Sequence, residues 1–170
     1  VANSLQNFYD RELEELTLAF KDGAGESWVK DYCQDQDTIS YVAVLDAEGK
    51  RQYSYGIDYD SYVEEELEAY LAYGAEEDGS YRARLLPAVL TKKNHFTQFL
   101  VGPAKVGGEN GWVIAAIEMD LVYSRIVEPV QIGENGYSMV KRMDGTILMH
   151  ASQNQIGLDA IDGRKEAYKE

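Results

Sequence analysis

Apolar residues recur every three or four positions along the first twenty residues of the chain. This spacing is that of one face of an amphipathic helix, and glutamates lie between the apolar positions. Asn3 or Ser4 is expected to cap the start of the helix, and Asp22-Gly23 to end it. A second, short helix is predicted over residues 27–34.

After this second helix the pattern changes to the two-residue alternation and dense apolar runs of β-strands. Residues 39–46 and 51–56 are predicted to form a hairpin around a short polar turn. Residues 62–73 return to helical spacing. The other predicted elements are strands at 81–90, 95–106 and 111–119, a helix at 120–130, and a hairpin of residues 136–140 and 146–150.

This order of elements predicts an α/β (α+β) fold, an antiparallel sheet with helices on one side and at one edge. The pattern YVAVLDAEG at residues 41–49 recurs as YSMVKRMDG at residues 137–145. Both combine an aromatic residue, an apolar strand and an acidic-glycine turn. The recurrence suggests two tandem copies of one α/β unit, a first domain over residues 1–130 and an incomplete second one over residues 131–170.

The charge of the chain excludes one class of partner. Its 170 residues include 16 Lys and Arg against 30 Asp and Glu, a net charge of −14. A chain this acidic is repelled by nucleic acid and by anionic lipid headgroups. Basic pairs such as Lys92-Lys93 are too small to form a binding patch. We therefore expect no nucleic-acid partner, whereas a cationic small molecule is compatible with the charge.

Cysteine content and hydropathy say little about the compartment. Cys33 is the only cysteine, so no intramolecular disulfide can form. The longest apolar run, residues 113–117, is too short to cross a membrane. Because the chain begins at Val1 and ends on a charged stretch, we expect it to be a piece of a longer protein, with any membrane anchor outside it.

The second hairpin carries the most specific motif in the chain. It comprises Gly133-Glu134-Asn135-Gly136-Tyr137, then Asp144-Gly145-Thr146, then His150, and finally Ile156-Gly157. This stretch resembles a recurring signature of double-Cache sensor domains, in which a glycine-tyrosine opens the first strand of the membrane-proximal module and a histidine ends the second. The family usually has proline after that histidine, where this chain has Ala151.

The rest of the chain agrees with this resemblance in order. The first helix looks like the spine helix of the family, and residues 41–56 look like the first hairpin of its membrane-distal module. Such domains are PAS-like folds outside the cell on histidine kinases, chemoreceptors and cyclic-dinucleotide enzymes. The resemblance therefore implies a ligand-sensing domain on the extracellular or periplasmic face of the bacterial cytoplasmic membrane, with a homodimer formed through the N-terminal helix.

The expected ligand is a small molecule, a carboxylate or an amine, held in the distal module. Amino-acid-binding members carry an arginine followed by a tryptophan-tyrosine pair, where this chain has only Tyr81-Arg82-Ala83-Arg84. Glu118 stands where their amine-holding aspartate would be. The predicted ligand-binding residues are Tyr53, Tyr55, Tyr81, Arg82, Arg84, His95 and Glu118.

Geometry and chemistry support this choice of residues. Tyr53 and Tyr55 share one face of their strand, as do Arg82 and Arg84, because residues two apart point the same way. Arginines or glutamates beside tyrosine hydroxyls can hold a small carboxylate or amine. Each of these side chains also fits a purely structural role, since tyrosines pack amphipathically and arginines are commonly solvated.

Enzymatic and metal-dependent functions find little support. The surroundings of Cys33 do not resemble a nucleophile site, even though His95 and His150 allow a Cys-His pair by count. Acidic runs fall in polar helix or loop contexts, where they are normally solvated. Metal-binding spacings and a calcium loop are missing, and Asp58-Tyr59-Asp60 would hold calcium only by accident. We therefore expect neither an enzyme nor a cofactor.

The alternative to a sensor is an extracellular protein-interaction module without a small ligand. Such a module would use the tyrosine-rich surface to hold a partner protein. An enclosed pocket would favour the sensor, and an open patch of tyrosines would favour the interaction module. A secreted hydrolase would require a nucleophile and a base that the sequence does not supply.

Overall fold

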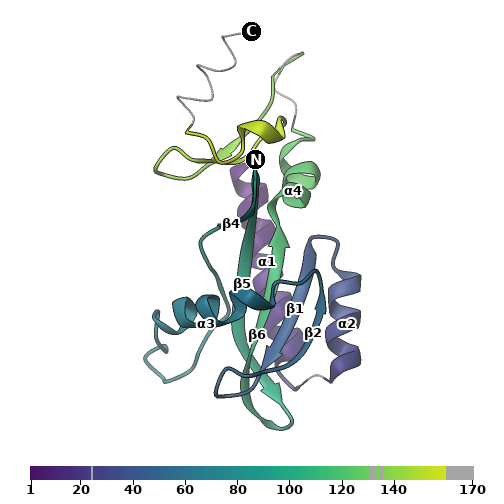
Figure 1. The fold of residues 1–170 in the computed structure, drawn as a ribbon, viewed down its shortest axis with the longest axis vertical. Coiled ribbons are helices and arrows are strands. Elements are labelled where there is room, and N and C mark those ends of the chain that lie inside the picture. The colour runs from purple at the N-terminus through teal and green to yellow at the C-terminus, as the bar shows by residue number, and fades with distance from the viewer. Residues whose placement is uncertain (24, 131–132, 135, 160–170) are drawn as a thin grey trace. The chain divides into compact units, whose positions relative to one another are not determined.

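The computed structural model describes residues 1–23, 25–130, 133–134 and 136–159. The chain forms two compact units, whose elements are labelled in Figure 1. Unit 1 contains Val1–Leu5, Ala88–Thr97 and the residues from Glu118 onward, and unit 2 contains Gln6–Pro87 and Gln98–Ile117. Searching the described residues for a helix long and apolar enough to cross a membrane finds none.

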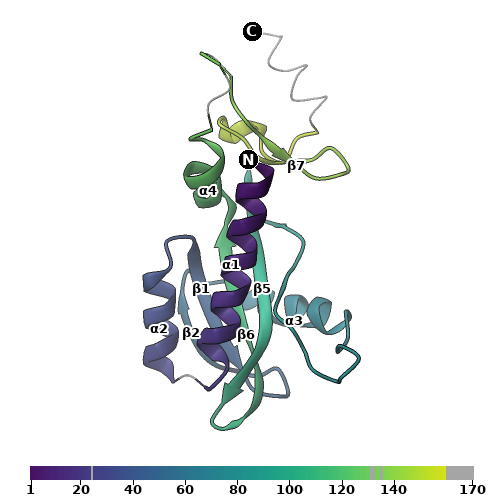
Figure 2. The ribbon, with the colours of Figure 1, turned by 180° about the vertical axis from the view of Figure 1, so that it is seen from behind.

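Two helices pack on one face of the sheet in unit 2. The helix α1 (Ala2–Phe20) buries Phe8, Glu12, Leu16 and Phe20, which recur every fourth residue along one side. The helix α2 (Glu26–Asp35) buries Val29, Tyr32 and Cys33. The Phe20 and Tyr32 rings meet edge to face at 5.3 Å. Figure 2 shows α1 in front of the strands and α2 beside β1 and β2.

The sheet is antiparallel and has the strand order β2-β1-β6-β5-β3, with β4 also paired to β5. The strands are β1 (Ile39–Leu45), β2 (Arg51–Gly56), β3 (Arg84–Leu85), β4 (Val89–Lys92), β5 (His95–Val106) and β6 (Glu109–Glu118). The predicted α+β class with an antiparallel sheet is confirmed.

The first hairpin joins a core strand to an exposed one. In β1 six of the seven residues are buried, whereas all six residues of β2 are exposed. The difference follows from position, because β1 pairs on both sides while β2 is the edge of the sheet. The turn between them is closed by Asp46, whose Oδ1 accepts the backbone N–H of Glu48 and of Lys50 at 3.1 and 2.8 Å.

Aromatic residues cover the opposite face of the sheet. The short helix η1 (Asp60–Tyr62) leads into α3 (Val63–Leu71). Tyr59 meets Phe99 of β5 edge to face at 5.8 Å, and Tyr70 meets Trp112 of β6 at 5.8 Å. The residues between β2 and β3 therefore pack through rings such as Tyr59 and Tyr70 as well as through the buried aliphatic side chains of Val63 and Leu67.

The predicted strand at residues 81–90 is wrong in extent. It is two short strands, β3 and β4, which belong to different units. Leu86 still donates its backbone N–H to the carbonyl oxygen of Phe99 at 2.9 Å. Pro87 follows and has no N–H to continue the ladder, which explains the interruption.

Unit 1 is built around the hairpin of β4 and the start of β5. Asn94 takes the positive φ of 57° in the turn, and its Nδ2 donates to the carbonyl oxygen of Ile156 at 2.7 Å. Arg142 donates to the carbonyl oxygen of Ala88 at 2.7 Å. The other elements are α4 (Met119–Val122), the π-helical turn η2 (Tyr123–Val127), β7 (Val140–Lys141), β8 (Ile147–Met149) and η3 (Gln153–Gln155).

The later elements are shorter than predicted. The helix expected over residues 120–130 is divided between α4 and η2 and ends before Pro129. The second hairpin is present, but only as the short pair β7 and β8. Its motif includes Asn135, which lies outside the described residues, as do residues 160–170. The domain boundary at residue 130 stays a prediction.

Candidate functional site

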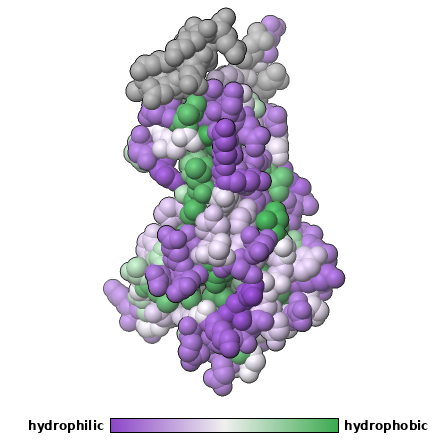
Figure 3. All heavy atoms as spheres, in the orientation of Figure 1, coloured by the Kyte–Doolittle hydropathy of each residue, from purple (hydrophilic) through white to green (hydrophobic). Residues whose placement is uncertain are grey.

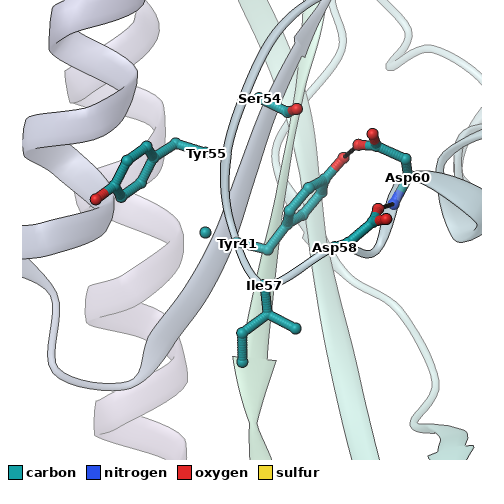
Figure 4. A pocket seen from close by; sticks show the side chains of 7 residues that line it. Tyr41, Ser54, Tyr55, Ile57, Asp58 and Asp60 are labelled. Atoms are coloured by element: carbon teal, nitrogen blue, oxygen red, sulfur yellow. Dashed lines mark hydrogen bonds between the residues drawn. The ribbon is translucent and has the colours of Figure 1, made fainter.

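The candidate site is a pocket of about 600 Å³ in unit 2, open to solvent, beside the end of the edge strand β2. Tyr41 of β1 contributes one side chain, and the others come from the end of β2 and the segment after it (Figure 4). The lining residues are Tyr41, Ser54, Tyr55, Gly56, Ile57, Asp58 and Asp60.

Tyr41 is the most buried residue of the pocket, with 1% of its surface exposed. Its hydroxyl donates to Oδ1 of Asp60 at 2.5 Å, and its ring meets Tyr59 edge to face at 6.0 Å. Burial raises the pKa of Tyr41 to about 12, with Asp58 adding to the rise and Arg51 opposing it. The hydroxyl therefore stays protonated and acts as a donor at neutral pH.

The backbone conformation of Gly56 explains how Asp58 and Asp60 come to line the same pocket as Tyr41. Gly56 has a φ of +106°, and a Cβ at this position would collide with the carbonyl oxygen of Ser40. The chain can therefore turn sharply off β2 into residues 57–60. In that turn Asp58 accepts the backbone N–H of Asp60 at 3.1 Å.

The two aspartates differ in their surroundings. Asp60 pairs with the guanidinium of Arg51 and accepts from Tyr41, so its charge is compensated. No basic side chain of the described residues pairs with Asp58, which is exposed. A search of the described residues finds no group of three or more His, Cys, Asp or Glu side chains that could hold a metal ion.

Tyr53 and Tyr55, two predicted ligand-binding residues, lie on the exposed strand β2. The Tyr55 hydroxyl accepts from Nε2 of Gln34 at 2.9 Å, and the Nζ of Lys30 lies 5.9 Å from its ring. Figure 4 shows this ring directed away from Tyr41 and toward the helix side. Tyr55 therefore lines the pocket at its margin, and Tyr53 is not among the lining residues.

The predicted residues at 81–84 form a cluster away from the pocket lining. Arg82 and Arg84 both pair with Oε1 of Glu76, at 3.2 and 3.1 Å. The two arginines were predicted to share one face, and in the structure they contact the same carboxylate oxygen. Tyr81 packs against Trp112 at 5.0 Å. Both guanidinium groups already have an anionic partner within the chain.

His95 and Glu118, the last two predicted residues, form a buried cluster in unit 1 with Asp120. The Nε2 of His95 bonds to Oε2 of Glu118, and its Nδ1 lies 2.7 Å from Oδ2 of Asp120. His95 and Glu118 are each 5% exposed. Each ring nitrogen of His95 therefore has a carboxylate oxygen within hydrogen-bond distance. Glu118 is therefore an internal hydrogen-bond partner.

The seven predicted residues thus belong to three clusters, and their role in ligand binding stays a prediction. The pocket itself adds Tyr41, Asp58 and Asp60, and Arg51 behind Asp60. The acidic segment was visible in the sequence as a weak calcium site. Nothing in the sequence distinguishes Tyr41 from the other core residues of its strand, because its contact with Asp60 depends on the turn at Gly56.

Comparison with solved structures gives strong matches in fold. The ligand-binding domain of the amino acid chemoreceptor PctB of Pseudomonas aeruginosa PAO1, in complex with L-Gln, has a TM-score of 0.61 and 19% identity. That of the chemoreceptor CtaA of Pseudomonas fluorescens, in complex with L-serine, has 0.60 and 17%. That of PctC of Pseudomonas aeruginosa PAO1, in complex with GABA, has 0.55 and 15%.

These matches cover 95–99% of this chain and 68–75% of the three solved chains. No protein-family model matches the sequence, and no curated protein matches it. At such low identity the likeness concerns the fold alone. The chain therefore shares the fold of these chemoreceptor ligand-binding domains, in agreement with the fold that the resemblance implied.

Proposed function

We propose that this chain is the outward-facing, small-molecule-sensing part of a bacterial transmembrane receptor. The observation that carries the proposal is the fold shared over nearly the whole chain with three ligand-binding domains of chemoreceptors. The pocket beside Tyr41 supplies a place for a ligand of the size those domains bind. In this proposal the output domain of the receptor is a kinase, a chemoreceptor signalling domain or a cyclic-dinucleotide enzyme, and the sensing domain itself has no catalytic role.

The proposed mechanism is a population shift. A ligand between Tyr41 and the segment 57–60 would order that segment and stabilise one arrangement of the sheet. The helix α1 packs on the other face of this sheet through Phe8, Leu16 and Phe20, so it would respond to the same change. The effect on α1 is limited to the difference in ligand affinity between the two arrangements.

The setting of the domain follows from the same proposal. The domain would lie on the extracellular or periplasmic side of the cytoplasmic membrane, anchored through segments outside this sequence. Two copies would associate through α1, whose Leu18 is 63% exposed. An exposed leucine on the helix is compatible with a helix-to-helix contact between copies.

A thermal-melt screen of the 170-residue chain tests the sensor function. The compounds are amino acids, small carboxylates, amines and nucleobases. A ligand at about 100 times its dissociation constant adds roughly 2.7 kcal/mol to the free energy of unfolding. For a domain of this size that corresponds to a rise in Tm of several degrees. Unchanged melting across all classes in a folded protein would contradict the sensor function.

A protein-interaction module without a small ligand is the second candidate. The exposed aromatic residues Trp28, Tyr53 and Tyr55, on α2 and the edge strand β2, favour it. Figure 3 shows hydrophilic residues over much of one face, with hydrophobic residues gathered between them. If no compound of the screen raises the Tm, the next test is whether a partner protein binds the chain and whether Tyr53→Ala weakens that binding.

A further inference from the structure

We infer that the ligand of the pocket beside Tyr41 is a small organic cation, an amine without a carboxylate group. This inference rests on the proposed sensing function and specifies the class of ligand. It departs from the solved neighbours, whose ligands L-Gln, L-serine and GABA each carry a carboxylate as well as an amine.

The first argument is the charge of the lining. The ionised side chains of the pocket are Asp58 and Asp60, and no arginine, lysine or histidine of the described residues is part of its lining. Tyr41 stays protonated, because burial raises its pKa to about 12. A carboxylate in this pocket would be repelled by Asp58, whose charge is not compensated by a basic side chain of the described residues, whereas an ammonium would be attracted to it.

The second argument is the difference between the two aspartates. Arg51 neutralises Asp60 from outside the lining, so Asp60 already has its cation. Asp58 has no such partner among the described residues and accepts only the backbone N–H of Asp60. Its remaining oxygen offers an acceptor to the N–H donors of a primary ammonium, whereas the hydroxyl of Ser54 already interacts with Tyr41. The pocket thus has one uncompensated negative charge at its wall.

The third argument concerns groups that would hold a ligand carboxylate. The arginines predicted for this task, Arg82 and Arg84, both pair with Glu76, and neither lines the pocket. Neither guanidinium is therefore available at the pocket wall to hold a ligand carboxylate. The net charge of −14 also attracts cations from solution and repels anions.

The test is a matched series of four-carbon compounds, measured by isothermal titration on the 170-residue chain. The compounds are butylamine, 1,4-diaminobutane, 4-aminobutanoate and butanoate. We expect both amines to bind and 4-aminobutanoate to bind about tenfold or more weakly, since Asp58 repels its carboxylate. Butanoate should not bind. Amine affinity should also fall as salt is raised.

Two variants place the amine at the pocket. Asp58→Asn keeps an oxygen acceptor for the backbone of Asp60 but removes the charge, so amine affinity should fall about tenfold. Asp22→Asn removes one exposed charge outside the pocket lining and is the matched control, with affinity unchanged. Arg51→Gln frees Asp60 and should tighten amine binding by about threefold, whereas a carboxylate ligand would bind more weakly.

The outcomes separate this inference from the sensor function. Tighter binding of 4-aminobutanoate or butanoate than of butylamine, or a loss of affinity in Arg51→Gln, would overturn the cationic ligand and leave the sensor in place. Amine binding that Asp58→Asn does not weaken would also overturn it. A chain that binds no compound in the four-class screen above would overturn the sensor function itself.

Discussion

Asp58 and Glu118 are both carboxylates, but one is exposed to solvent and the other is buried and hydrogen-bonded within the fold. Asp58 lies exposed at the pocket wall, with one backbone donor and no basic partner among the described residues. Glu118 is 5% exposed and bonds to His95, which Asp120 contacts through the other ring nitrogen. A carboxylate whose hydrogen bonds are used inside the fold stabilises the fold. One that keeps acceptors open to solvent can bind a ligand.

The largest effect should come from removing the histidine of the buried cluster. His95→Leu removes the imidazole that bonds to the buried Glu118, and breaking a buried pair in this way costs about 3–5 kcal/mol. Urea denaturation of the variant and the natural chain measures the difference. The double variant His95→Leu with Glu118→Leu removes both polar groups of the pair and should recover a large part of the loss. A loss below about 1 kcal/mol in the single variant would mean that solvent reaches Glu118.

Glu66 of α3 sharpens the comparison, because it is buried like Glu118 but has no basic partner among the described residues. Burial, and after it the neighbouring Glu65, raises the pKa of Glu66 from 4.5 to about 7. Between those pH values the folded chain holds a proton that the unfolded chain has released. Stability should therefore fall as pH rises through this window, by on the order of 2–3 kcal/mol.

Glu66→Gln is the variant that checks this dependence. It cannot ionise, so its free energy of unfolding should vary less between pH 5 and pH 8 than that of the natural chain, and it should be the more stable protein at pH 8. Glu65→Gln, one residue earlier and exposed, is the matched control and should keep most of the dependence. An unchanged pH profile in Glu66→Gln would show that Glu66 is ionised in the folded state.

A smaller effect is expected at the pocket. Tyr41→Phe removes the hydroxyl that donates to Asp60, while Arg51 still compensates the carboxylate. Losing one hydrogen bond to a charged group should cost about 1–2 kcal/mol. Thermal unfolding of the variant measures it, and Tyr53→Phe on the exposed strand is the control that should change nothing. If both variants lost the same stability, the hydrogen bond from Tyr41 to Asp60 would contribute no more than the contacts of an exposed tyrosine hydroxyl.

The fold was largely predictable because its signals are local. The helices α1 and α2 end within two residues of their predicted limits, since apolar spacing and the following glycines or polar residues lie within each segment. The strand predicted at 81–90 failed because its apolar run continues past Pro87, and only the missing N–H interrupts the ladder. The spacing of apolar residues does not show where one missing backbone N–H, here that of Pro87, ends a strand.

The site was less predictable because its contacts are between segments. The two-residue spacing placed Arg82 and Arg84 on one face, and both do bond the same atom. Their partner is Glu76, whose position depends on the path of the loop after α3. Tyr41 meets Asp60 for a similar reason, through the turn at Gly56. Residue type and spacing identified groups able to bind a ligand, but not which of them already had a partner.

The smallest effects should come from the arginines at Glu76. The side chains of Arg82 and Arg84 are 68% and 33% exposed, and each exposed ion pair contributes less than about 1 kcal/mol. Arg82→Ala and Arg84→Ala should therefore alter the free energy of unfolding by less than that amount and leave butylamine affinity unchanged, whereas Asp58→Asn weakens it. If either arginine variant instead abolishes ligand binding while Asp58→Asn does not, the ligand site lies at Glu76. The carboxylates beside Tyr41 would then have a structural role, and the contrast with Glu118 would not extend to function.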